Sequence, residues 1–194
     1  GTIAFNSTVD GTQDLTLDSG AGNIDFDAAV GAGVALGAIQ IDDAADVTAD
    51  STITATSLTQ SDGTGTTTLD GAVSTSGAAG VDVTTDTIAV NASITTANAG
   101  TVTLTADGDG GGAGTVTIAA AGDINSDGAV TLTAVGGIDT SADVTTTGDD
   151  VTYASATTLS DGISVTSAGG TIAFNSTVDG TQDLTLDSGA GNID

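Results

Sequence analysis

The sequence predicts an all-β fold: a parallel β-helix with about 21 residues per coil and three short strands in each coil. Three observations predict it, namely a composition that suits strands and turns, apolar residues that recur at a steady spacing, and a perfect internal repeat. The segment GTIAFNSTVDGTQDLTLDSGAGNID occupies residues 1–25 and returns at residues 170–194, which defines a 169-residue repeat. Eight coils fill that length.

The composition favours strands and limits the range of partners. All 26 acidic residues are Asp, and the chain has no Lys, Arg, His, Cys, Met, Pro or Trp, so its formal net charge is −26. Abundant Thr, Val and Ile between Gly and Asp are typical of short strands joined by turns. A chain without Lys or Arg cannot neutralise phosphates, which excludes nucleic acid and anionic membrane surfaces as partners. No apolar run is long enough to insert into a membrane.

Apolar residues form three series that advance by about one coil length at each step. The first series is Ile3, Ile24, Val47, Leu69 and Ile88, then a gap, then Val130, Val151 and Ile172. The second series is Val9, Val30, Ile53, Val73, Ile94, Val116, Ile138, Leu159 and Val178. The third series is Leu15, Leu36, Leu58, Val81, Val102, Ile124, Val144, Ile163 and Leu184. Each series takes eight steps to reach its own copy, so we expect three stacked walls.

Within many of these positions the pattern is apolar-x-apolar, as in IAF, LTL, VDV and VTY. Alternation with period two places both apolar side chains on one face of a strand. Corners rich in Gly and Asp separate the strands, and stacked coils pair them in parallel. A β-sandwich is the alternative, because its strands have similar spacing. A sandwich gives no reason for a sustained register of one coil length, so we favour the β-helix.

The aromatic residues predict one stacked column inside the helix. The chain has four of them, Phe5, Phe26, Tyr153 and Phe174, and each lies two residues after a member of the first series. Leu132 lies one coil before Tyr153. Similar side chains one strand spacing apart stack well in a solenoid interior, so we expect these five residues to face inward in one column.

The repeat also predicts the domain organisation. Residues 1–169 are interpreted as one complete β-helical unit, and residues 170–194 as the start of the next identical unit, without a linker. We expect the second copy to superpose on the first by translation along the axis with a small twist. The chain is therefore expected to be an interior window of a longer tandem array, with its two ends at opposite ends of a rod.

Three stretches resemble a known protein family: LTLDSGAGNIDF (15–26), VTIAAAGDINSDGAV (116–130) and VTLTAVGGIDTSADV (130–144). They are similar to the repeats of filamentous-haemagglutinin-type adhesins and related giant bacterial surface proteins. Those repeats combine an apolar-Thr-apolar strand, a small Ala/Gly turn and Gly-Asx-Ile. The resemblance implies a secreted, right-handed β-helix that serves as a stalk or fibre, and it implies no catalytic or ligand residues. The 169-residue repeat and the lack of Lys and Arg depart from the family and favour a fibre over a binding tip.

Two Asp-containing segments are candidate calcium loops. The stretch DGDGGGAG (107–114) interrupts the first series, and Asp with Gly resembles calcium-binding repeats, although we favour a bulged corner or a protruding loop without a metal. The stretch DINSDG contains Asp123, Asn125 and Asp127, but the twelfth position of such a loop is Ala134 instead of an acid. The pairs Asp86–Asp107 and Asp25–Asp46 are each separated by one coil length, but neither extends to a third coil. We therefore assign no metal-binding residues, and Ca²⁺ stays an open alternative.

Other functions have weaker support in the sequence. The neighbouring pairs Asp42–Asp43 and Asp149–Asp150 lack any Arg, Lys or His to orient a sugar or tune a carboxylate, so we expect no enzyme. Rows of outward Thr could bind ice, but the rows do not persist along the coils. These rows are Thr101, Thr103 and Thr105, then Thr131 and Thr133, then Thr152 with Ala154. Asn6, Asn91 and Asn175 stand in glycosylation sequons, so glycans are a further hypothesis.

These observations predict a structural protein located outside the cell or on its surface. We expect a segment of a bacterial filament or adhesin stalk, whose main partner is itself through tandem stacking and lateral bundling. The alternative is a Ca²⁺-dependent binding module that recognises a partner or a surface polysaccharide. Asp residues are expected at corners and at outward strand positions.

Overall fold

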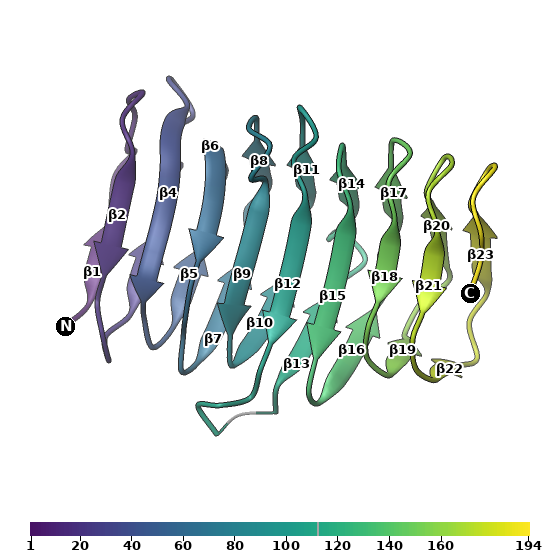
Figure 1. Cartoon of the computed structure of the whole chain (residues 1–194). Helices are drawn as coiled ribbons and strands as arrows, with labels where there is room; N and C mark the ends of the chain where they lie inside the picture. The colour runs from purple at the N-terminus through teal and green to yellow at the C-terminus, as the bar shows by residue number, and fades with distance from the viewer. Residues whose placement is uncertain (112) are drawn as a thin grey trace.

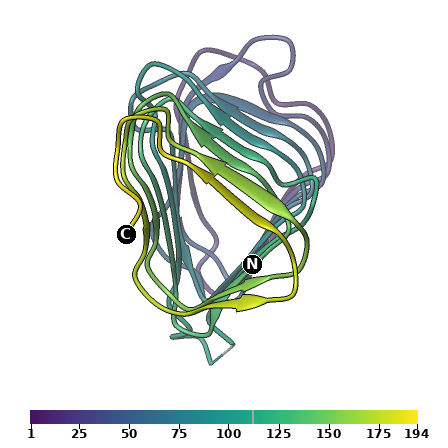
Figure 2. The same cartoon turned by 90° about the vertical axis from the view of Figure 1, so that its right-hand side faces the viewer.

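The computed structural model describes residues 1–111 and 113–194, and it confirms the predicted fold class. Those residues form 23 strands and no helix, so none of them belongs to a helix that could cross a membrane. The strands stack as turns of a solenoid whose two termini lie at opposite ends (Figure 1). Viewed from the C-terminal end, the chain runs counterclockwise as it approaches the viewer (Figure 2), so the helix is right-handed.

Three walls, which we call faces one, two and three in chain order, surround the core. Face one is a nine-stranded sheet of β1 (Ile3–Phe5), β3 (Ile24–Phe26), β5 (Val47–Ala49), β7 (Thr66–Leu69), β10 (Thr87–Val90), β13 (Thr115–Ile118), β16 (Gly137–Thr140), β19 (Thr157–Leu159) and β22 (Val178–Gly180). Every pair of neighbouring strands in it is parallel.

Faces two and three belong to one sheet that bends around a corner. Face three consists of β2 (Leu15–Asp18), β4 (Leu36–Asp43), the second half of β6 (Ile53–Gln60), β9 (Val81–Thr85), β12 (Val102–Ala106), β15 (Val130–Ala134), β18 (Val151–Tyr153) and β21 (Ile172–Phe174). Face two consists of the first half of β6, β8 (Val73–Thr75), β11 (Ile94–Thr96), β14 (Ile124–Ser126), β17 (Val144–Thr146), β20 (Ile163–Thr166) and β23 (Leu184–Asp187). The long strand β6 joins both faces because it pairs with β8 through its first half and with β9 through its second half.

Alternation along each strand fills the interior, as the apolar-x-apolar pattern predicts. In β12, Val102, Leu104 and Ala106 are fully buried, whereas Thr103 and Thr105 between them face outward. Leu104 packs between Val83 and Leu132 of the adjacent turns. The buried apolar residues form one continuous cluster along the solenoid. Burial of this cluster is the main favourable term in folding.

One turn is longer than the others and shifts the three series. Val102 pairs with Val81 of the preceding turn and with Val130 of the following turn, and the step to Val130 is the longer of the two. The extra residues lie between β12 and β13, and the chain leaves the wall after Ala106, where residues 107–111 project from the body (Figure 1). The segment 107–114 has only Asp, Gly and Ala side chains, which cannot fill the interior position of a wall strand. The next apolar strand therefore takes that wall position.

Because of this insertion, the predicted assignment of the three series to the three faces is wrong beyond the fifth turn. Val116 lies on face one beside Ile88, not on face two beside Ile94 as predicted. Ile124 then lies on face two beside Ile94, and Val130 lies on face three beside Val102. Up to the insertion the three series match the three faces, apart from exchanges of near neighbours such as Ile39 in place of Leu36.

The aromatic residues consequently form two columns instead of the single column predicted. Phe5 stacks on Phe26 on face one, with ring centroids 5.2 Å apart and ring planes 7° apart. Leu132, Tyr153 and Phe174 stack in order on face three. All of these side chains point inward, and Phe26 and Tyr153 are almost fully buried. The inward orientation is confirmed, and the single column is wrong.

The two copies of the repeated segment therefore occupy different faces. Ile3 is on face one, and Thr157 lies seven turns further along that face. Ile172, the copy of Ile3, lies two strand positions after Thr157, on face three. The unit thus spans seven full turns and two of the three strand positions of the next turn. Rounded to whole turns, this length equals the predicted eight coils. Superposition of the copies needs an added rotation of two-thirds of a turn, so the predicted simple translation is wrong.

Corner carboxylates connect successive turns. Each accepts a hydrogen bond from a backbone N–H of the next turn: Asp10 from Gly33 at 2.7 Å, Asp14 from Ala38 at 2.8 Å, Asp46 from Thr66 at 2.9 Å, Asp143 from Ser164 at 2.7 Å and Asp150 from Thr171 at 2.7 Å. Charged acceptors make such bonds strong. The expected placement of Asp at corners and outward positions is confirmed, with one exception at Asp86, which is buried.

Candidate functional site

Three carboxylates converge at the corner between faces three and one, where the insertion leaves the wall. Asp86 directly follows β9, Asp107 directly follows β12, and Asp109 lies two residues further along. One oxygen atom from each of the three side chains lies within 4.8 Å of the other two. We call this group the acidic corner, and it is the one such group of three among residues 1–111 and 113–194.

The backbone ladder places Asp86 and Asp107 on adjacent turns. The Asp86 N–H donates to the Gly63 carbonyl at 2.8 Å, and the Asp107 N–H donates to the Thr85 carbonyl at 3.0 Å. The second bond extends the parallel pairing of β9 and β12 by one residue, and the first continues the pairing of β9 with the preceding turn, so the two acids keep the spacing of neighbouring strands.

A left-handed glycine brings the third carboxylate back to the corner. Gly108 has a φ of 67°, a conformation that glycine adopts without steric strain. The chain reverses there, and the Asp109 N–H lies 3.4 Å from Asp107 Oδ1, which accepts its hydrogen bond. The sequence Asp-Gly-Asp is thus the local cause of the convergence.

Asp86 is the unusual member of the acidic corner. Its side chain is 4% exposed, and it is the one buried acid among the described residues. Its Oδ1 atom is buried and has no hydrogen-bond partner. Gly108 lies beside it, and a β-carbon at that position would lie 3.9 Å from Oδ1, in ordinary van der Waals contact. Removal of a carboxylate from water without a partner is unfavourable, so this position needs a compensating group.

The charges of the acidic corner repel one another. The negative charge of Asp107 raises the pKa of the Asp109 carboxyl, and partial desolvation and the charge of Asp62 raise it further. Asp62 belongs to the turn that precedes Asp86. The sequence contains no Lys, Arg or His side chain that could neutralise this group. The arrangement is therefore suited to a cation from solution.

The other predicted calcium segment has a different role. Asp123 accepts a hydrogen bond from the Asp143 N–H at 3.0 Å. Asp127 accepts one from the Ala99 N–H at 2.8 Å and one from the Thr147 hydroxyl at 2.9 Å. The hydrogen bond from the Ala99 amide, and then that from Thr147, lower the pKa of the Asp127 carboxyl. These acids connect neighbouring turns and do not converge on one point.

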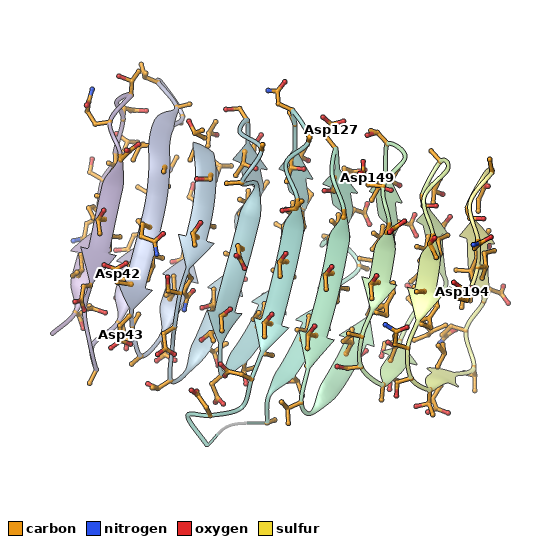
Figure 3. The ribbon with its side chains drawn as sticks, viewed as in Figure 1. Asp42, Asp43, Asp127, Asp149 and Asp194 are labelled. Atoms are coloured by element: carbon orange, nitrogen blue, oxygen red, sulfur yellow. The ribbon has the colours of Figure 1, made fainter. Side chains whose placement is uncertain are left out.

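The adjacent acid pairs lie at separate corners of the solenoid. Asp42 and Asp43 lie near the lower ends of the N-terminal turns, whereas Asp149 lies toward the opposite corner (Figure 3). Asp42 and Asp149 are exposed. The structure does not bring the two pairs together.

Polar residues on face two line a shallow groove of about 490 Å³. Its floor includes the outward side chains of Thr95, Asn125 and Thr145 on three adjacent strands, and Asn98 and Asp127 stand at its edge. Asn98 adopts a φ of 55°, and its amide donates to the Ser76 carbonyl at 2.8 Å, which fixes this corner.

The predicted Thr rows and sequons also have definite places. Thr103, Thr131 and Thr152 form three rungs on the outside of face three, and this ladder ends at Asp82 on one side and Ala173 on the other. Asn6, Asn91 and Asn175 are exposed. The Asn91 amide donates to Asp70 Oδ1 at 2.7 Å.

Comparisons of this chain with protein-family models, with curated proteins and with solved structures found no match. The functional argument therefore depends on the geometry of the solenoid and of the acidic corner.

The sequence indicated only part of the acidic corner. The spacing of one coil length between Asp86 and Asp107 predicts neighbours on adjacent turns, as observed. The return of Asp109 and the burial of Asp86 were missed. The Asp-Gly-Asp triplet that follows β12 is the signal that could have indicated them.

Proposed function

We propose that this chain is a structural segment of an extracellular bacterial filament or giant adhesin stalk, extended by tandem stacking of its 169-residue unit. One observation carries the proposal: the second copy of the repeated segment continues the same solenoid. Ile172 pairs with Val151, and Leu184 pairs with Ile163, both in parallel register. Parallel pairing of each turn on the previous one allows such a unit to extend without a new type of contact.

The surface chemistry supports a scaffold role. Outward positions carry Thr, Ser, Asn and Asp, and corner carboxylates bind backbone amides of the next turn. The resemblance to filamentous-haemagglutinin-type repeats supports a location outside the cell or at its surface. The net charge of −26 without any basic residue opposes close lateral contact at low salt, so bundling of fibres would need cations.

Rod length tests the proposal. Proteins with one, two and three copies of the 169-residue unit would be imaged by electron microscopy. Seven and two-thirds turns at about 4.8 Å each predict a gain of roughly 37 Å for each added unit, at constant width. Labelling of intact source cells with an antibody to the unit tests the location. Width that grows with copy number, or labelling only after cell lysis, would contradict the proposal.

A second candidate is a Ca²⁺-dependent binding module for a partner or surface polysaccharide. The polar groove on face two favours it, because hydroxyl and amide side chains with an acid at the edge suit a carbohydrate ligand. A glycan array probed with and without EGTA tests this candidate. Substitution of Asn125, an outward residue of the groove, should abolish any specific binding, whereas substitution of Thr103 on face three should not.

A further inference from the structure

The buried carboxylate of Asp86 calls for a partner that the chain itself does not supply. Its Oδ1 atom is buried and accepts no hydrogen bond, and a carboxylate oxygen of Asp107 and one of Asp109 lie within 4.8 Å of an Asp86 oxygen. A cation bound among the three side chains would compensate such a group. No side chain of the sequence is positively charged, so the cation must come from solution.

We propose that Asp86, Asp107 and Asp109 bind one Ca²⁺ ion. Hard divalent cations prefer carboxylate oxygen, and the chain has neither the Cys nor the His that softer metals select. Two ligands on opposite sides of Ca²⁺ lie roughly 4.8 Å apart, and roughly 4.2 Å apart for Mg²⁺. The three carboxylate oxygens lie within 4.8 Å of one another, so one Ca²⁺ ion can contact all three, whereas Mg²⁺ demands octahedral geometry and seldom binds through several protein ligands.

The carboxylates supply at most six of the oxygen ligands that Ca²⁺ takes, and water completes the set. Asp62 is close enough to act electrostatically on Asp109, so it adds negative charge beside the ion. An ion at this point connects the turn of β9 with the start of the insertion after β12. It therefore holds the projecting segment against the wall. This site does not depend on the filament proposal.

Calorimetric titration of the 194-residue chain with CaCl₂ tests the site, in about 0.15 M KCl to screen weak surface binding. We expect one Ca²⁺ ion per chain and a higher melting temperature in CaCl₂ than in EGTA or in MgCl₂ at equal ionic strength. Asp109→Asn and Asp86→Asn should each weaken binding about tenfold or more, because ligand charge sets the affinity. Asp82→Asn, which removes one exposed acid from β9, should bind as the unchanged protein does.

Several results would overturn the proposal. The site is refuted if no stoichiometric binding is detected, or if Asp109→Asn binds Ca²⁺ as well as Asp82→Asn does. Equal stabilisation by Mg²⁺ would refute selectivity for Ca²⁺. If the chain binds no Ca²⁺ and Asp86→Asn raises the melting temperature in EGTA, Asp86 is an uncompensated buried acid and the cation site is refuted. Asp109 is exposed, so its variant keeps the test valid even where Asp86→Asn does not fold.

Discussion

Tyr153 and Phe174 stack one turn apart on face three, with ring centroids 4.6 Å apart and ring planes 12° apart. The two rings pack in nearly the same way, but only the first carries a hydroxyl group. That hydroxyl is buried and has no hydrogen-bond partner. The inward position is therefore better suited to Phe than to Tyr.

Tyr153→Phe is expected to stabilise the protein by about 1 kcal/mol, because it removes a buried donor that forms no bond. Urea unfolding followed by circular dichroism measures the change. The reciprocal variant Phe26→Tyr, on face one, should destabilise the protein. Loss of stability in Tyr153→Phe would show that the hydroxyl has a partner, such as buried water, and would contradict the prediction.

Alkaline pH should unfold the protein through the same residue. Burial, and then the negative charge of Asp143, raise the pKa of the Tyr153 hydroxyl. In the unfolded chain this residue ionises at the ordinary Tyr pKa of about 10. The free energy of unfolding is therefore at its full value below that pH and decreases as the pH rises above it. Tyr153 is the one side chain that titrates there, since the sequence has no Lys, Arg or Cys. Tyr153→Phe should abolish the fall, and a fall that persists in this variant would contradict the assignment.

The core of the solenoid should tolerate truncation poorly. Leu104→Ala is expected to cost about 2–5 kcal/mol, because Leu104 is fully buried between two other apolar side chains. Val135 is 78% exposed, so Val135→Ala should change stability by less than about 0.5 kcal/mol. Urea midpoints of the two variants provide the comparison, and equal effects would argue against the observed inward register of β12.

Asp127 should stabilise the protein at neutral pH and lose that effect in acid. Its folded pKa lies below the ordinary value, chiefly because the Ala99 amide donates to it. The contribution of Asp127 to the free energy of unfolding is fully present above the unfolded pKa of about 3.9. It is lost as the pH falls through the lower folded pKa. Asp127→Asn should therefore be less stable than the unchanged protein at pH 7, and the two should converge in strong acid. Asp82→Asn controls for the loss of one exposed charge, and a deficit independent of pH would oppose this account.

The period of the sequence predicted the fold because each apolar-x-apolar triplet shows by itself which of its side chains point into the core. Ile24 and Phe26, or Val102 and Leu104, identify an inward face without reference to the rest of the chain. The face on which a triplet lies is a different kind of information, since it depends on every residue inserted before it. Counting in equal steps of one coil length assigned a wall position to the segment 107–114, although that segment has nothing to bury.

The acidic corner was harder to predict for a related reason. Its members come from two turns and a projecting segment, and they meet only because that segment leaves the wall directly after Ala106. Gly108 lies beside the buried Oδ1 atom of Asp86, and a pattern of spacings does not contain that contact. Sequence spacing thus predicts neighbours within the walls but not the groups that gather where a wall is interrupted.

The displacement between Ile3 and Ile172 has a mechanical consequence for any chain that repeats the 169-residue unit, as we propose. Each unit begins one strand position short of eight full turns, so the projecting segment moves to a new side in each successive unit and returns to its first side after three. Weak points along such a rod are distributed around the axis instead of aligned along one side. The rod would then have no preferred direction of bending, and a lateral load would meet the same flexural stiffness whichever side it came from.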